Sequence, residues 1–243
     1  MAKKQSKRTI VGSPLTPVLL KELGALNEFP FTPEDFKPDG NWTNKYRIWT
    51  CHGYRESSNE NVGFVRLKRI PESDKTFTLN IHQEIAQTDD ITNIIDGTIK
   101  CRNDILASPV QWNLSSSFKD ANRKHIAELS SINNGPGTKS IDGATGDWCL
   151  FEMVQRLAFD KQNSLSFDLL EGMSLSKPSH RLFYRGIYPI KTNEKNISLH
   201  CFVQLGNGIL PYEYWLDTRH RLLVVTSMNK AYILDDQAEK SIM

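Results

Sequence analysis

Residues 196–236 have the sequence NISLHCFVQLGNGILPYEYWLDTRHRLLVVTSMNKAYILDD, and this stretch predicts the fold class. In its first segment apolar residues occupy every second position, which is the period of a half-buried strand. Gly206-Asn207-Gly208 then supplies residues that tolerate positive φ, as a hairpin turn requires. Polar turns at 217–220 and 227–230 divide the remainder. Strands joined by such short connections must pair antiparallel, so the stretch predicts an antiparallel meander.

A second series of alternating segments lies upstream, between residues 44 and 114. It begins with Tyr46, Ile48 and Thr50, and polar turns separate its later segments. This pattern predicts a second antiparallel meander. Residues 119–145, in contrast, are polar and contain Asn-Asn-Gly-Pro-Gly, so we expect a flexible loop there.

Two short segments have the signature of helices. In 147–157, apolar residues recur at i, i+3, i+4 and i+7 from Leu150, and Asp147 can cap the start. In 16–26, Thr16 precedes a proline and a run of apolar residues, which is typical of a helix start. The fold class that follows is α+β but mainly β. We expect a curved antiparallel sheet, an incomplete barrel of meanders, packed against one or two helices.

The length of 243 residues suits one β-rich domain. We therefore expect a single antiparallel β-rich domain over 15–236. The basic residues near the start predict a disordered tail over 1–14, and the last residues, 237–243, predict a second tail.

Charge and hydropathy exclude several classes of partner. The chain has 30 basic and 28 acidic residues, so it lacks the basic surface that a nucleic-acid-binding protein needs. No apolar run reaches the ~20 residues that span a bilayer, which predicts no membrane span. The segment Thr9-Ile10-Val11-Gly12-Ser13-Pro14 is broken before an apolar core region can form, which predicts no signal peptide. If the chain is a trimmed mature form, an extracytoplasmic location is favoured.

Cysteine and histidine spacing predicts neither a metal site nor a cofactor. The cysteines lie about 50 residues apart with no CxxC pair, and no two histidines stand at i, i+2 or i+4. Buried cysteines without a disulfide are the expectation, because a disulfide requires an exporting host. Hydrolase, kinase and dehydrogenase signatures are absent, so no catalytic residue is assigned and a non-catalytic protein is favoured. The cysteines are Cys51, Cys101, Cys149 and Cys201.

Aromatic side chains on the predicted strands are the candidate ligand-binding residues. If the curved sheet does not close, its concave face needs cover from the helices, and incomplete cover leaves an apolar pocket. A fully packed interior is the alternative. Tyr214 and Trp215 point to opposite faces, so one of them at most lines such a pocket. The candidates are Trp49, Phe64, Trp112, Tyr184 and Tyr214.

The final meander resembles the closing hairpins of secreted bacterial proteins of unknown function. The residues that carry this resemblance are Gly206-x-Gly208-x-Leu210-Pro211-x-x-Tyr214-Trp215-Leu216-Asp217, followed by Arg221-Leu222-Leu223. The sheets of those proteins resemble the half-barrels of LolA/LolB-type lipoprotein carriers. The resemblance implies an extracytoplasmic protein whose incomplete barrel wraps around a helix and holds a lipid-like molecule. It transfers no catalytic residue, and this chain shows no lipid-attachment cysteine near its start.

Three functions remain open at this point. The first is a non-catalytic protein that binds an apolar or amphipathic ligand on the concave face of the sheet. The second is a polysaccharide-active enzyme, a lyase or hydrolase. The third is an envelope interaction module. The oligomeric state is open for all three. The residues of the enzyme hypothesis are Arg47, Tyr54, Arg66, Lys68, Arg69, His82 and Glu84.

Overall fold

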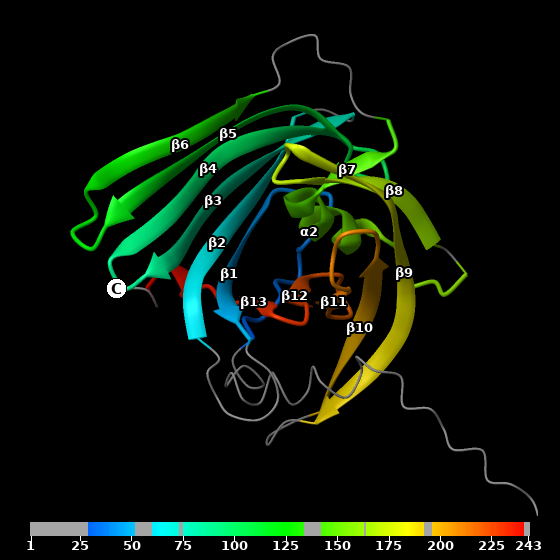
Figure 1. Ribbon diagram of the computed structural model, residues 1–243. Helices are drawn as coiled ribbons and strands as arrows, with labels where there is room; N and C mark the ends of the chain where they lie inside the picture. Colours follow the sequence, from blue (N-terminus) through cyan, green and yellow to red (C-terminus); the bar gives the residue numbers. More distant parts are fainter. Residues whose placement is uncertain are drawn as a thin grey trace, which may run out of the picture.

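The computed structural model describes residues 29–51, 60–72, 75–133, 142–162, 164–191 and 196–240. These residues form one sheet of 13 strands and an internal α-helix (Figure 1). The strands of the first half are β1 (Trp42–Thr50), β2 (Glu60–Pro71), β3 (Thr76–Thr88), β4 (Ile91–Arg102), β5 (Pro109–Asp120), β6 (His125–Asn133) and β7 (Ala144–Gly146). After helix α2 (Asp147–Arg156) come β8 (Ser164–Glu171), β9 (Leu175–Lys191), β10 (Asn196–Leu205), β11 (Tyr212–Leu216), β12 (Leu222–Thr226), β13 (Lys230–Leu234) and the 3-10 turn η2 (Ala238–Lys240).

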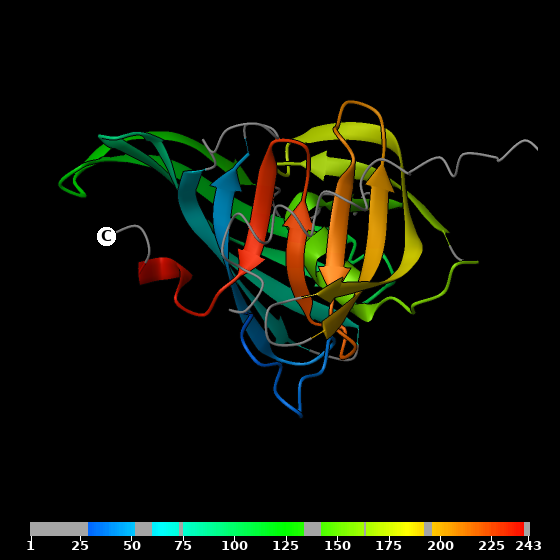
Figure 2. The same ribbon diagram turned by 90° about the horizontal axis from the view of Figure 1, so that it is seen from below.

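The strand order is β6-β5-β4-β3-β2-β1-β13-β12-β11-β10-β9-β8-β7. The two predicted meanders are confirmed, and the long-range antiparallel pair β1·β13 joins them, with Tyr46 opposite Leu234. Figure 2 shows β1, β13, β12, β11 and β10 side by side. In the described part of the chain, β7·β8 is the parallel pair. No ladder among the described residues joins β6 to β7, so the sheet is curved and unclosed, as predicted.

Two local predictions have different outcomes. The helix predicted at 147–157 is present as α2, although Gly146 occupies the N-cap position and Asp147 is the first helical residue. The loop predicted over 119–145 is wrong for β6, because 125–133 pairs with β5. β6 is an edge strand, and its first three residues are exposed, so no apolar alternation marks its start. The tail at 1–14 and the helix at 16–26 lie outside the described residues.

Strands β11 and β12 are buried on both faces. Every residue of β12 is buried, and Tyr214 and Trp215, which point to opposite faces of β11, are 2% and 1% exposed. This arrangement explains why the chain here carries nearly continuous apolar residues instead of strict alternation. The interior face of the sheet packs on α2, and the opposite face is part of the same hydrophobic core.

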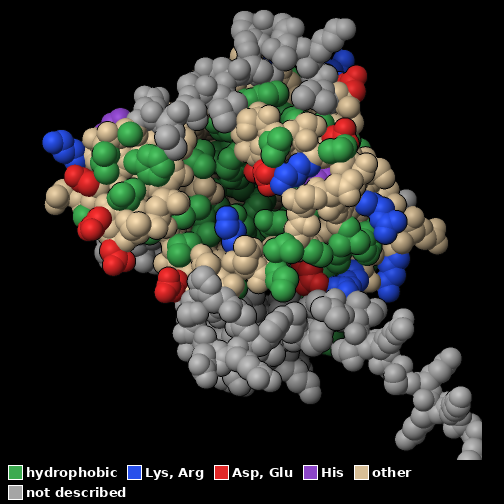
Figure 3. Space-filling view, in the orientation of Figure 1, with side chains coloured by type: hydrophobic (Ala, Val, Ile, Leu, Met, Phe, Trp, Pro, Cys, Tyr) green, Lys and Arg blue, Asp and Glu red, His purple; other side chains and the backbone are tan. Residues whose placement is uncertain are grey.

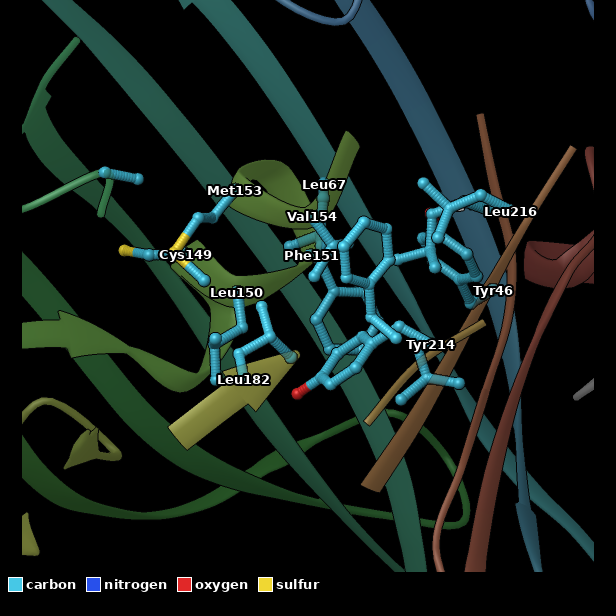
Figure 4. Close-up of a cluster of buried hydrophobic side chains, with 14 of the residues drawn as sticks. Tyr46, Leu67, Cys149, Leu150, Phe151, Met153, Val154, Leu182, Tyr214 and Leu216 are labelled. Atoms are coloured by element: carbon cyan, nitrogen blue, oxygen red, sulfur yellow. Dashed lines mark hydrogen bonds between the residues drawn. The ribbon is translucent and has the colours of Figure 1, made fainter. Parts of the chain in front are cut away.

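Helix α2 lies inside the curve of the sheet (Figure 1). Its residues from Cys149 to Gln155 are all buried, which leaves no polar face toward solvent. Phe151 is at the centre of the contact: its ring meets those of Tyr46, Tyr214 and Tyr232 edge-on, at centroid distances of 5.4, 6.3 and 5.3 Å. Figure 4 shows Phe151 pointing toward Tyr46 and Tyr214. The polar side chains of such a buried helix must pair with other groups of the protein, because water does not reach them.

No helix in the described part of the chain has the length and apolar character needed to cross a membrane.

Candidate functional site

A buried ion-pair network lies in the C-terminal half of α2. The Arg69 Nε donates to Glu152 Oε1 at 2.8 Å, and both side chains are at most 1% exposed. Arg156 also reaches Glu152, at 2.7 Å from its Nε. The Arg69 guanidinium further donates to backbone carbonyls of Asp39 and Gly40 and lies 4.2 Å from the Phe77 ring centroid. Such complete pairing is what keeps buried charges tolerable.

A second polar group fixes the same end of α2 to β12. Gln155 Oε1 accepts from the backbone N–H of Leu222 at 3.1 Å and from Asn44 Nδ2 at 3.4 Å. Its Nε2 donates to the Phe151 carbonyl at 2.9 Å. Arg221 Nε completes the set by donating to Asn44 Oδ1 at 3.2 Å. Hydrogen bonds to β1 and β12 therefore fix the position of the helix against the sheet, in addition to packing.

A stack of three rings follows the C-terminal end of α2. Phe159 lies between His200, at 3.6 Å and 8° between ring planes, and His220, at 3.9 Å and 4°. The Tyr184 hydroxyl lies 2.7 Å from His200 Nδ1. Burial lowers the pKa of both histidines, so the imidazoles are neutral at pH 7 and stack as uncharged rings. These contacts fill the space that follows the C-terminal end of α2.

The inner side of the curved sheet is hollowed on the face drawn in Figure 3. Figure 3, in the orientation of Figure 1, shows a recess at the centre of this face, lined mainly by hydrophobic side chains, inside the curve of the sheet. Tyr212, Tyr214 and Tyr232 share the interior face of β11 and β13, and Asp147 at the start of α2 interacts electrostatically with all three. Tyr214 is buried and donates to Gln204 Oε1 at 2.7 Å. Tyr212 and Tyr232 are only partly buried.

Burial affects the protonation of Tyr212, Tyr232 and Asp147. It raises the pKa of Tyr212 and Tyr232, so both phenols are neutral and can donate hydrogen bonds at pH 7. It also raises the pKa of Asp147 to about 6. Asp147 accepts from the backbone N–H groups of Gly172, at 3.1 Å, and of Trp148, at 3.0 Å, which limits the rise. The result is a mainly apolar surface with two hydroxyl groups and one weakly acidic carboxyl group.

The raised pKa of Asp147 predicts a pH-dependent stability. The folded pKa of about 6 exceeds the ordinary value of 3.8, so the folded state binds more protons between these values. The stabilisation is complete below pH ~4 and is lost as pH rises through 6. Because the side chain is partly exposed, we expect Asp147→Asn to gain only about 1–2 kcal/mol relative to the wild type between pH 4 and 7. Urea unfolding at both pH values measures this, with the exposed Asp89→Asn as control; equal shifts in both variants would contradict it.

The predicted ligand-binding aromatics divide between the two faces of the sheet. Trp112 on β5, Tyr184 on β9 and Tyr214 on β11 face the interior. Trp49 alternates with the interior residue Ile48, and Phe64 lies 5.5 Å from His82 on the outer face. The structure thus brings three of the five to the side of the sheet that holds α2. The binding role of all five stays a prediction.

The residues of the enzyme hypothesis also divide between faces. Arg69 points inward to Glu152, whereas Arg66 and His82 form a cross-strand pair on the outer face. His82 Nδ1 lies 2.6 Å from Asp96 Oδ1, and Glu84 receives both Arg123 amino groups at 2.7 and 2.9 Å. His82 and Glu84 are therefore paired with residues outside the group of the enzyme hypothesis. Of the others, Arg47 pairs with Asp235 and Arg66 with Glu239, Lys68 is exposed, and Tyr54 lies outside the described residues.

No family model and no curated protein matches this sequence. Among solved structures, the chain is similar to a beta-barrel-like protein of the domain of unknown function DUF1849 from Brucella abortus. The TM-score is 0.50 at 9% sequence identity, and the match covers 80% of this chain and 95% of that chain. At this identity the likeness concerns the fold alone, and it confirms a β-barrel-like sheet. The resemblance to LolA/LolB-type carriers stays a prediction.

Two pockets are lined in part by the segment that precedes β1. One, of about 310 Å³, is lined by residues 29–32, β10 and the 217–219 turn, and the other, of about 250 Å³, lies near Trp42 and Arg221. None of the interior tyrosines lines either pocket.

The candidate ligand-binding residues chosen from the sequence do not include Tyr212, Tyr232 or Asp147. The signal for Tyr212 was present, because it stands two positions before Tyr214 and must share its face. No local signal identified Tyr232 or Asp147. Their proximity depends on β13 and α2 meeting across the barrel.

Proposed function

We propose that this protein is a non-catalytic binding protein whose hollow, at the N-terminal end of α2, takes an apolar or amphipathic ligand. The observation that carries the proposal is the recess lined by hydrophobic side chains inside the curved sheet (Figure 3). Burying apolar ligand area in such a recess contributes roughly 25 cal/mol per Å² and needs no titrating centre.

Tyr212 and Tyr232 form part of the wall in this proposal. Both face the interior, both pack against the hydrophobic core, and both keep partial exposure. An interior-facing side chain that still reaches solvent must border an open space. Tyrosine offers a ring to an apolar chain and a hydroxyl donor to a polar head, which is the combination that an amphipathic ligand requires.

The packing at the C-terminal end of α2 supports entry of the ligand from the other end of the helix. The Arg69–Glu152 pair and the Phe159 ring stack occupy the C-terminal end of α2, so a ligand enters from the end that carries Asp147. The apolar part of the ligand then lies against the sheet and the polar part remains at the mouth, near the two hydroxyl groups and the carboxyl group.

Fluorescence of N-phenyl-1-naphthylamine, a neutral apolar probe, tests the proposal. We expect enhancement with the wild type and a dissociation constant about tenfold higher for Tyr212→Ser/Tyr232→Ser, because two rings of contact area are lost. Tyr188→Ser is the matched control: Tyr188 contacts Trp215 on the opposite face, at 5.6 Å between ring centroids, and its loss should change the constant less than twofold. No enhancement with the wild type, or equal weakening by the control, would refute the proposal.

Solvent extraction of the purified protein followed by mass spectrometry identifies the ligand class. A stoichiometric amphipathic molecule that is lost in Tyr212→Ser/Tyr232→Ser and kept in Tyr188→Ser is the expected result.

A further inference from the structure

Two cysteines that are distant in the sequence face each other inside the barrel. Cys101 lies near the end of β4 and Cys149 in the first turn of α2, 48 positions later. Their Sγ atoms are 3.7 Å apart, and both residues are 0% exposed. Figure 4 shows Cys149 on the side of α2 that points away from Phe151. The contact therefore joins α2 to β4, on the side of the helix that does not contact the tyrosine rings.

The pair is well placed for a covalent bond. A disulfide needs an S–S distance of about 2.05 Å, so the two sulfur atoms must approach by less than 2 Å, a movement that small side-chain rotations provide. The side chains already point at each other, and both backbones are held by regular structure, β4 in its ladders with β3 and β5 and α2 in its helix. The other two cysteines lie on different strands: Cys51 follows β1, and Cys201 is on β10.

We propose that Cys101 and Cys149 form a disulfide that ties α2 to β4 when the chain folds in an oxidising environment. The oxidant is a disulfide, either of a low-molecular-mass thiol or of a protein dithiol. One cysteine thiolate attacks it to give a mixed disulfide, and the second thiolate displaces the carrier thiol. The two cysteines lose two protons and two electrons, and the oxidant is reduced to two thiols.

The exchange takes place before α2 is enclosed. Both sulfur atoms are fully buried in the folded barrel, so an external disulfide cannot reach them there. Burial also raises the pKa of the Cys101 thiol, which suppresses the reactive thiolate once folding is complete. In a reducing environment the same two thiols pack as small apolar groups. The bond is thus set during folding and protected afterwards.

Refolding of the full chain in a glutathione redox buffer tests the proposal. The unfolded, reduced protein is refolded with reduced and oxidised glutathione, denatured without reductant, alkylated and mapped by mass spectrometry. We expect a cross-linked peptide pair containing Cys101 and Cys149, with Cys51 and Cys201 alkylated. Four alkylated thiols, or a cross-link that involves Cys51 or Cys201, would overturn the proposal.

Urea unfolding supplies the second readout. Closing a loop of 48 positions should lower the unfolding equilibrium constant on the order of 30- to 1000-fold, and reductant present during unfolding should abolish the effect. Comparing each protein with and without reductant separates the bond from any packing change. Cys51→Ala/Cys201→Ala should keep the difference and Cys101→Ala should lose it. A difference that persists in Cys101→Ala would contradict the pairing.

Discussion

Replacing Glu152 by glutamine should destabilise the protein by about 3–5 kcal/mol. Glu152 is fully buried in α2 and accepts from Arg69 and Arg156 at 2.8 and 2.7 Å. The substitution leaves the Arg69 guanidinium buried without its counter-charge, and removing one partner of a buried ion pair costs far more than the pair contributes. The carbonyls of Asp39 and Gly40 still accept from Arg69, but they carry no full charge. Chemical denaturation with circular dichroism measures the loss.

Two further variants distinguish this cause from simple loss of packing. Glu239→Gln removes a carboxylate that pairs with Lys45 and Arg66 at 2.7 and 2.6 Å but is 29% exposed, so its cost should stay below about 1 kcal/mol. Arg69→Met/Glu152→Met should be more stable than Glu152→Gln alone, because it leaves no unpaired charge on Arg69. If the double variant is less stable than Glu152→Gln, the electrostatic explanation is wrong.

Replacing Phe151 by alanine should cost a similar amount, about 3–5 kcal/mol, for a different reason. Phe151 is 7% exposed and meets the rings of Tyr46, Tyr214 and Tyr232. Removing its ring deletes these edge-on contacts and opens a cavity that the surrounding strands cannot close, since hydrogen-bonded ladders hold them in place. The midpoint of urea unfolding should fall accordingly.

The same variant lowers stability but should not weaken ligand binding in the proposed hollow. Phe151 contacts Tyr214 and Tyr232, so the cavity left by its ring lies beside the tyrosines of the proposed site and should enlarge that site. We expect N-phenyl-1-naphthylamine to bind Phe151→Ala at least as tightly as the wild type, although the protein is less stable. Phe31→Ala, whose side chain is 78% exposed, should change neither quantity by more than about 0.5 kcal/mol. Weaker probe binding in a folded Phe151→Ala would place the recess elsewhere.

The sequence alone predicted the elements whose causes are local. Alternation from Leu199 to Leu205 and the turn at 206–208 predict β10 and its pairing with β11, because a short connection permits only antiparallel neighbours. The spacing from Leu150 to Leu157 predicts α2 for the same kind of reason. The edge strand β6 escaped prediction because its exposed first residues carry no apolar period.

The candidate site was only partly accessible from the sequence. Tyr184 and Tyr214 were identified as strand aromatics, but the same pattern selected Trp49 and Phe64, which lie on the outer face. Strand period assigns alternate residues to opposite faces without saying which face is concave. Aromatic content therefore selected residues from both faces.

Local pattern determined that this chain forms antiparallel meanders with an amphipathic helix between them. Only the tertiary structure decided that β1 pairs with β13, that α2 lies inside the curve, and that Glu152 and the Cys101–Cys149 pair are buried there. The physical reason is the range of the interactions. Turn geometry and side-chain period act over a few residues, whereas burial, charge pairing and sulfur contact depend on segments that are tens to hundreds of positions apart and meet only when the sheet curves around the helix.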